Sequence, residues 1–197
     1  MSTQRSESSS NKICLCSSSP TRALLLEQFG IDFIQNTPSY DEEQIVAANA
    51  KDFVYTASKG KMEAAIKEFG LETPLLCADT VITASDGTVL RKPRNIEDAR
   101  RILEIQSGSV IFILSSLHFQ SKKLLFSDIS ATQYHFDSFD SIDMEAYLQS
   151  GLWRGKAGGC MVEGFCKKYI KSVAGLESTA MGLQVEKLLP WIGRYHV

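Results

Sequence analysis

A run of hydroxyl side chains followed by an arginine comes directly after the first apolar segment of the chain. Ser17, Ser18 and Ser19 precede Pro20, and Arg22 follows two residues later. Backbone N–H groups at the start of a helix carry partial positive charge and bind anions. Serine hydroxyls can donate to the same anion, and an arginine can hold two phosphate oxygens at once. The pattern therefore favours phosphate binding, although an ordinary serine cap has the same sequence.

A second candidate is a carboxylate that follows a run of apolar residues. Asp79 comes directly after Leu75-Leu76-Cys77-Ala78, a pattern typical of a buried strand. Ligands of α/β proteins bind where strands end. Asp79 in that place can bind a divalent cation or accept a proton from water. A turn aspartate without any ligand remains the alternative.

Lysines and glycines supply the remaining candidates. Lys61 falls in an expected helix and Lys92 follows an expected hairpin, and such lysines are usually solvated. The segment 156–164 is rich in glycine but lacks the spacing of a P-loop. It either lets the backbone approach a ligand that Glu163 contacts, or it is a turn without a ligand.

Helices and strands must interleave to bring these residues together. Ser19 and Pro20 predict the start of a helix that ends at Gly30, because serine is a common cap and proline fits the first turn. The other expected helices cover residues 50–69, 96–106, 141–151, where Ser141 is the expected cap, and 178–189. Strands are expected over 13–16, 31–35, 74–78, 81–83 with 88–90, 110–119, 124–136 and 169–173. This order predicts an α/β fold with a mixed, twisted sheet.

Length and charge limit the classes of protein that fit. The chain has 197 residues, enough for a single domain with its own core. Its 21 Lys and Arg against 23 Asp and Glu give a net charge of −2, which argues against a nucleic-acid partner held by bulk electrostatics. No apolar stretch reaches the length of a membrane span. We expect residues 1–11 to be a disordered tail, because they are polar, and residues 12–197 to form one domain.

The cysteines indicate a reducing compartment. The five cysteines include no C-x-x-C pair, and none of the three histidines is spaced to complete a zinc site with them. Cys14 and Cys16 would share one face of a strand as small buried hydrophobes. We therefore expect reduced thiols and a cytoplasmic location.

Taken in order, these segments resemble the Maf family of nucleoside triphosphate pyrophosphatases. The resemblance covers about residues 12–190 and rests on modest motifs that follow one another in the family's order. They are Ser17–Arg22, Asp41-Glu42, the helix with Lys61, Ala78–Ile82, Gly87–Pro93, Leu103–Gly108, Lys156–Gly164 and Val173–Leu176.

The resemblance implies two α/β lobes around a central cleft, as in inosine triphosphatases. It implies hydrolysis of a nucleoside triphosphate to the monophosphate and pyrophosphate with Mg²⁺, or with Mn²⁺ or Co²⁺. The roles it assigns are phosphate binding to Ser17, Ser19 and Arg22, catalytic charge neutralisation to Lys61 and Lys92, metal binding to Glu42 and Asp79, and activation of water also to Asp79.

Three positions that distinguish the bases accepted by family members hold Thr21, Thr80 and Glu163 here. Members that act on dTTP and UTP carry Arg, Thr and Gln, whereas a glutamate at the third position resembles the branch that takes 7-methyl-GTP. A carboxylate accepts hydrogen bonds only, whereas an amide both donates and accepts. The set is mixed, so the base preference stays open between a pyrimidine and a modified or non-canonical base.

Two other functions compete with this one. The family's link to septum formation and cell division makes a non-enzymatic, nucleotide-binding regulator the alternative. A simple phosphate-ester hydrolase would release orthophosphate instead of pyrophosphate. A homodimer is expected for a chain of this size with exposed strands, and neither a nucleic acid nor a membrane is expected as a partner.

Overall fold

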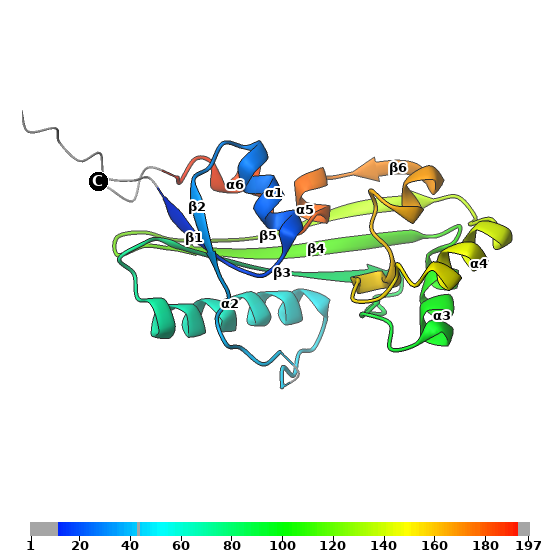
Figure 1. Cartoon of the computed structure of the whole chain (residues 1–197), viewed down its shortest axis with the longest axis horizontal. Coiled ribbons are helices and arrows are strands. Elements are labelled where there is room, and N and C mark those ends of the chain that lie inside the picture. Colours follow the sequence, from blue (N-terminus) through cyan, green and yellow to red (C-terminus); the bar gives the residue numbers. More distant parts are fainter. Residues whose placement is uncertain (1–11, 43, 193–197) are drawn as a thin grey trace, which may run out of the picture.

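The computed structural model describes residues 12–42 and 44–192, so the expected N-terminal tail lies outside the described residues. One six-stranded sheet runs through them in the order β2-β1-β3-β4-β5-β6 (Figure 1). The strands are β1 (Ile13–Cys16), β2 (Phe33–Asn36), β3 (Leu75–Ala84), β4 (Val110–Gln120), β5 (Leu125–Phe136) and β6 (Ile170–Ala174). β1 pairs in parallel with β2 and β3, and the other three pairings are antiparallel. The predicted mixed sheet is therefore confirmed.

Helices cover both faces of the sheet at the end that holds β1. α2 (Ala50–Phe69) lies on one face, and α1 (Pro20–Gln28), α5 (Glu177–Ala180) and α6 (Val185–Leu188) lie on the other (Figure 1). Ile13 and Leu15 of β1 belong to the core under α1 and α6, whereas Cys14 and Cys16 face α2. Because both faces of β1 are buried, its sequence is continuously apolar instead of alternating.

A second core occupies the other end of the long strands. There α3 (Ile96–Gln106), α4 (Ser141–Ser150) and the short 3₁₀ helices η1 (Ala157–Gly159) and η2 (Phe165–Tyr169) gather around apolar residues of β3, β4 and β5. Phe136, Phe139 and Tyr169 are among the aromatic side chains buried in it. The two cores share the three long strands, which gives the predicted pair of lobes.

One of the two expected helix caps is present. Ser19 caps α1 by accepting a hydrogen bond from the Arg22 backbone N–H at 3.3 Å, and Asn95 caps α3 in the same way. The expected cap of α4 is wrong by one residue. Asp140, not Ser141, accepts from the Ile142 and Asp143 N–H groups through Oδ1, and its negative charge is favoured at the start of a helix.

Two expected elements differ in the structure. Asp79 does not end its strand, because β3 continues to Ala84 along a partner, β4, that extends equally far. The expected hairpin follows, with Leu90 N–H donating to Ile82 O at 2.7 Å. The single helix expected over 178–189 is two short helices, α5 and α6, separated by a turn in which Gly182 has a φ of 100°.

The cysteines behave in two ways. Cys14, Cys16 and Cys77 are buried free thiols, as expected for small hydrophobic residues. Cys160 and Cys166 form a disulfide, so the expectation of five reduced thiols is wrong for this pair. Across the described residues, none of the helices combines the length and the apolarity that crossing a membrane requires.

Candidate active site

A cavity of about 570 Å³ opens between the two lobes. All residues predicted to form the functional site line this one cavity, although they come from segments spread over most of the chain. They are Ser17, Ser19, Thr21, Arg22, Glu42, Lys61, Asp79, Thr80, Lys92 and Glu163. The structure therefore brings the predicted site together.

The cavity forms where β1 stops and β3 continues. β1 pairs with β3 only as far as Leu76, so the part of β3 that carries Asp79 and Thr80 runs past the end of β1. Successive side chains of a strand point to opposite faces. Asp79 accordingly meets Lys61 of α2, and Thr80 meets Arg22 of α1.

Arg22 is a buried cation that joins three parts of the site. Its Nη1 donates to Ser17 Oγ at 3.0 Å, and its Nη2 donates to Thr80 Oγ1 at 3.1 Å. Its Nε donates to the carbonyl of Gly182 at 2.8 Å. Burial lowers the pKa of the guanidinium, while the negative charges of Asp79 and Glu42 oppose that effect. A fixed positive charge therefore lies directly behind the serine loop, where it favours an anion.

The Ser17–Ser19 loop is shaped by its own hydroxyl groups. Ser17 Oγ accepts from the Ser19 backbone N–H at 3.2 Å as well as from Arg22. The loop ends at the N-terminus of α1, whose free N–H groups complete an anion-binding surface. Gln35 of β2 donates to the Ser17 carbonyl at 2.6 Å and ties the loop to the neighbouring strand.

Lys61, which lines the cavity, lies between two carboxylates. Its Nζ is 2.5 Å from Glu42 Oε1 and 2.6 Å from Asp79 Oδ1. The Asp79 side chain is 8% exposed, and the Glu42 side chain is 43% exposed. Burial raises the pKa of the Asp79 carboxyl, and the nearby Lys61 opposes that rise. The buried carboxylate is thus a stronger proton acceptor than a solvated one.

A close contact between a loop and a helix brings Glu42 to Lys61. The Tyr40 ring lies over Gly60 of α2, where a Cβ atom would be 2.2 Å from the ring carbon Cζ and the hydroxyl oxygen. Only a glycine leaves room for this approach. Gly60, which weakens the helix in sequence terms, therefore serves to admit the loop that carries Glu42.

The two carboxylates suit a hard divalent cation. Glu42 and Asp79 both point at one nitrogen atom, so their oxygens already converge on one small volume. Among the described residues, no group of three or more His, Cys, Asp or Glu side chains could hold a metal ion. Mg²⁺ is usually bound by one or two carboxylates together with phosphates and waters. The donor set therefore fits an ion that arrives with a phosphate ligand.

The cavity lining also contains residues that the sequence did not single out. Lys156 and the buried Gln106 are among them, together with the apolar residues Ile82, Ile111 and Ile113. Lys156 could have been found, because it begins the glycine-rich Lys156–Gly164 segment. Gln106 lies on a helix face with an ordinary apolar pattern and gives no signal in the sequence.

Comparisons with known proteins agree on one family. The model of the Maf-like protein family matches residues 12–194. A nucleoside triphosphate pyrophosphatase of a Nitratiruptor species is 53% identical over 178 residues, which cover 89% of this chain and 96% of that protein. A protein of the same name from Helicobacter pylori (strain Shi470) is 36% identical over 90% of this chain and 93% of its own length. A dTTP/UTP pyrophosphatase of Acholeplasma laidlawii is 28% identical over 94% of this chain and 97% of its own length.

Proposed function

The chain belongs to the Maf-like protein family, and on that premise we propose that it is a nucleoside triphosphate pyrophosphatase. The reaction splits a nucleoside triphosphate into the monophosphate and pyrophosphate. One observation carries the proposal: anion-binding groups around Arg22 and a convergent pair of carboxylates, Glu42 and Asp79, line one cavity. Phosphate transfer needs both kinds of group at the same place.

The serine loop and the cations bind the triphosphate in this proposal. Ser17 and Ser19 donate to phosphate oxygens together with the N-terminus of α1, and Arg22 supplies the fixed charge behind them. Lys61 and Lys92 neutralise the negative charge that grows on the departing pyrophosphate. The ammonium group of Lys92 makes no ion pair with any described residue, so it is available to a ligand.

Water attacks the α-phosphorus, and the bond from that phosphorus to the bridging oxygen breaks as pyrophosphate leaves. Asp79 accepts the proton from the water, a role that its raised pKa supports. Glu42 and Asp79 would hold Mg²⁺, Mn²⁺ or Co²⁺. When bound, the ion would polarise the phosphate oxygens and neutralise part of their charge.

Thr21, Thr80 and Glu163 are proposed to select the base. The Thr80 hydroxyl is already engaged by Arg22 at 3.1 Å and lies 2.9 Å from Ser115 Oγ, so it is held in a fixed place. Glu163 is exposed at the rim and can accept hydrogen bonds from N–H groups of a base. The accepted base is pyrimidine, modified or non-canonical, and a panel of such triphosphates will decide between them.

The substitution Asp79→Asn tests the proposal. Pyrophosphate release should fall at least a thousandfold, because the variant loses the proton acceptor and a metal ligand, while nucleotide binding persists. Asp32→Asn, at an exposed aspartate away from the cavity, is the matched control and should retain full activity. Full activity of Asp79→Asn would refute the assigned role.

The same assay separates the competing functions. Binding without turnover of any triphosphate would favour a nucleotide-binding regulator of septum formation. Orthophosphate as the product would indicate a phosphate-ester hydrolase. A cytoplasmic location and a homodimer are further proposals, which fractionation of cells and light scattering of the purified protein will test.

A further inference from the structure

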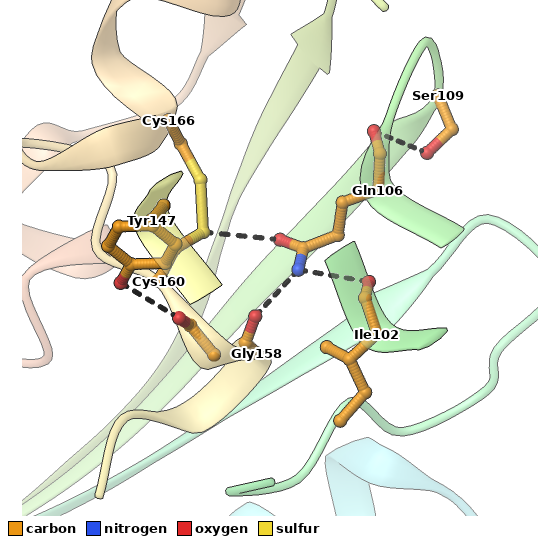
Figure 2. Close-up of a disulfide and its surroundings, with 8 residues drawn as sticks. Ile102, Gln106, Ser109, Tyr147, Gly158, Cys160 and Cys166 are labelled. Atoms are coloured by element: carbon orange, nitrogen blue, oxygen red, sulfur yellow. Dashed lines mark hydrogen bonds between the residues drawn. A yellow bond between two sulfur atoms is a disulfide. The ribbon is translucent and has the colours of Figure 1, made fainter. Parts of the chain in front are cut away.

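The disulfide closes a loop that forms part of the cavity wall. Cys160 and Cys166 are six residues apart, with their Cα atoms separated by 6.6 Å. Between them, Met161, Val162 and Glu163 line the cavity together with Cys160 itself. Figure 2 shows the bond beside α3 and the glycine-rich segment. The proposed base-contacting residue is therefore carried by a covalently closed loop.

Both ends of this loop are firmly held. Before it, the Gly158 carbonyl accepts from Gln106 Nε2 at 2.6 Å, and the Gly159 carbonyl accepts from the Tyr147 hydroxyl at 2.9 Å (Figure 2). After it, Cys166 is fully buried in the core beneath α3 and α4. The disulfide joins these two fixed points directly.

The stretch from Met161 to Gly164 has few other restraints. Its backbone hydrogen bonds within the described part of the chain are local ones, from Gly164 N–H to the Met161 carbonyl and from Lys167 N–H to the Gly164 carbonyl. No backbone bond connects it to the sheet or to a long helix in the residues described. Without the disulfide, the position of Glu163 would therefore depend on this single turn and on side-chain packing.

A buried amide connects the oxidation state to the cavity. Gln106 is 1% exposed, and its Nε2 donates to two carbonyl groups, which fixes its Oε1 at 3.8 Å from Cys160 Sγ. A disulfide sulfur carries no hydrogen and cannot donate to this oxygen, whereas a thiol can. Reduction thus gives Cys160 a new hydrogen-bond partner on a residue that itself lines the cavity.

We propose that the Cys160–Cys166 disulfide positions Glu163 for nucleotide binding, so that the oxidation state of the pair and the occupancy of the cavity are coupled. This inference rests on the nucleotide site proposed above. The oxidised loop presents Glu163 in one place, and the reduced loop must be ordered by the nucleotide. Ordering one long side chain on binding weakens affinity about three- to tenfold.

The redox step itself is ordinary thiol–disulfide exchange. One thiolate of the pair attacks a low-molecular-weight disulfide such as oxidised glutathione and releases one glutathione thiolate. The second cysteine then attacks the mixed disulfide, forms the Cys160–Cys166 bond and releases the second glutathione. Two protein thiols are oxidised, one glutathione disulfide is reduced to two glutathione thiols, and the protons that the protein thiols lose are taken up by the released glutathione. The cavity gives the reagent access to Cys160, which lines it.

Linkage gives a test that needs no turnover. A ligand that binds the oxidised form more tightly shifts the thiol–disulfide equilibrium by the same factor. The probes are α,β-methylene analogues of UTP and GTP, and the readout is the fraction of Cys160–Cys166 disulfide in glutathione redox buffers, measured by alkylation and mass spectrometry. At a saturating concentration, the analogue that binds should lower the midpoint potential of the Cys160–Cys166 pair. A tenfold tighter binding to the oxidised form corresponds to a shift of about 30 mV.

Kinetics supply the second readout. For the turned-over nucleotide, reduction should raise KM about three- to tenfold with kcat changed less than twofold, because Lys61 and Asp79 lie on other elements. The Cys160→Ser, Cys166→Ser double variant keeps the three buried thiols and should not respond to reductant. Glu163→Ala should lose the redox dependence of KM while it retains the disulfide, a result that a purely structural bond would not produce.

Three results would overturn the inference. They are five titratable thiols after equilibration with oxidised glutathione, an unchanged midpoint potential with a bound analogue, and a redox-dependent KM that persists in Glu163→Ala. If no triphosphate is hydrolysed in either redox state, the proposed function fails. The midpoint measurement with the bound analogue still decides the coupling in that case.

Discussion

Alanine at position 60 tests how the loop with Glu42 is held against α2. The added Cβ would lie 2.2 Å from the Tyr40 Cζ and hydroxyl oxygen, a distance at which the ring must move away. Tyr40 lies two residues before Glu42, which contacts Lys61 at 2.5 Å. Displacement of the ring therefore withdraws Glu42 from its partner.

The expected effects on stability and on activity differ in size. Alanine stabilises a helix by about 0.8–1 kcal/mol relative to glycine. This gain offsets the packing that the half-buried Tyr40 ring loses when it moves, which costs of order 1 kcal/mol. The free energy of unfolding should therefore change by less than about 1 kcal/mol. Loss of a residue that orients a metal ligand typically lowers activity about 10- to 100-fold. Gly60→Ala should accordingly fold normally and release pyrophosphate at least tenfold more slowly.

The assay is pyrophosphate release at saturating and subsaturating Mg²⁺, with stability followed by urea denaturation. Thr56→Ala, on the exposed side of the same helix, is the matched control and should retain full activity. If the clash with Tyr40 is the cause, the double variant Gly60→Ala, Tyr40→Ala will lose less activity than the sum of the two single losses in activation free energy. A kcat/KM of Gly60→Ala within twofold of the wild-type value would refute the argument that this contact positions Glu42.

Three further predictions concern two cations of the cavity lining and a buried histidine of β4. Lys61→Met removes the cation between two carboxylates, so the unfolding free energy without metal should fall by about 3 kcal/mol. It should recover when Mg²⁺ is added, and urea denaturation with and without Mg²⁺ measures both values. Arg22→Lys removes the planar guanidinium group, which donates hydrogen bonds to three oxygen atoms. The kcat/KM for the preferred triphosphate should therefore fall about 100-fold, and added metal should restore little of it. His118 is buried, and burial followed by the positive charge of Lys59 lowers its pKa. The stability that the neutral His118 ring contributes is therefore fully present above the unfolded-state pKa of about 6.5. It is lost as the pH falls towards the lower pKa of the folded state, by at most about 1.4 kcal/mol per pH unit. Between pH 7.5 and 5.5, the unfolding free energy measured by urea denaturation should fall less for His118→Gln than for the wild-type protein. An equal fall in both proteins would contradict this explanation.

The first part of the chain could be predicted because local signals agree there. The apolar run of β1, the serine cap and the proline of the first helical turn each specify the same strand, loop and helix. Arg22 lies behind that loop, with its Nη1 donating to Ser17 Oγ, and its role in phosphate binding stays a prediction.

The departures arise from contacts between segments distant in sequence. Asp79 looks like the end of a strand, since a charged residue follows an apolar run, but β4 pairs with β3 beyond it and Ser116 lies opposite. The turn at Gly182 places its carbonyl on Arg22 Nε, 160 residues away in sequence, and interrupts an otherwise helical pattern. Neither partner is visible in the local sequence, so local periodicity could not anticipate either result.

The charges of the cavity explain why a nearly neutral chain can bind a highly charged substrate. Without a ligand, Lys61 is matched by Glu42 and Asp79, so these groups contribute little net attraction for phosphate. A divalent ion that takes over the two carboxylates would release the Lys61 ammonium towards phosphate oxygens. The Lys92 and Lys156 side chains line the same cavity and form no ion pair with any of the residues described. The metal ion would replace Lys61 as the partner of the two carboxylates, and phosphate oxygens would replace the carboxylates as partners of Lys61. The metal and the triphosphate should therefore each bind much more tightly when the other is present.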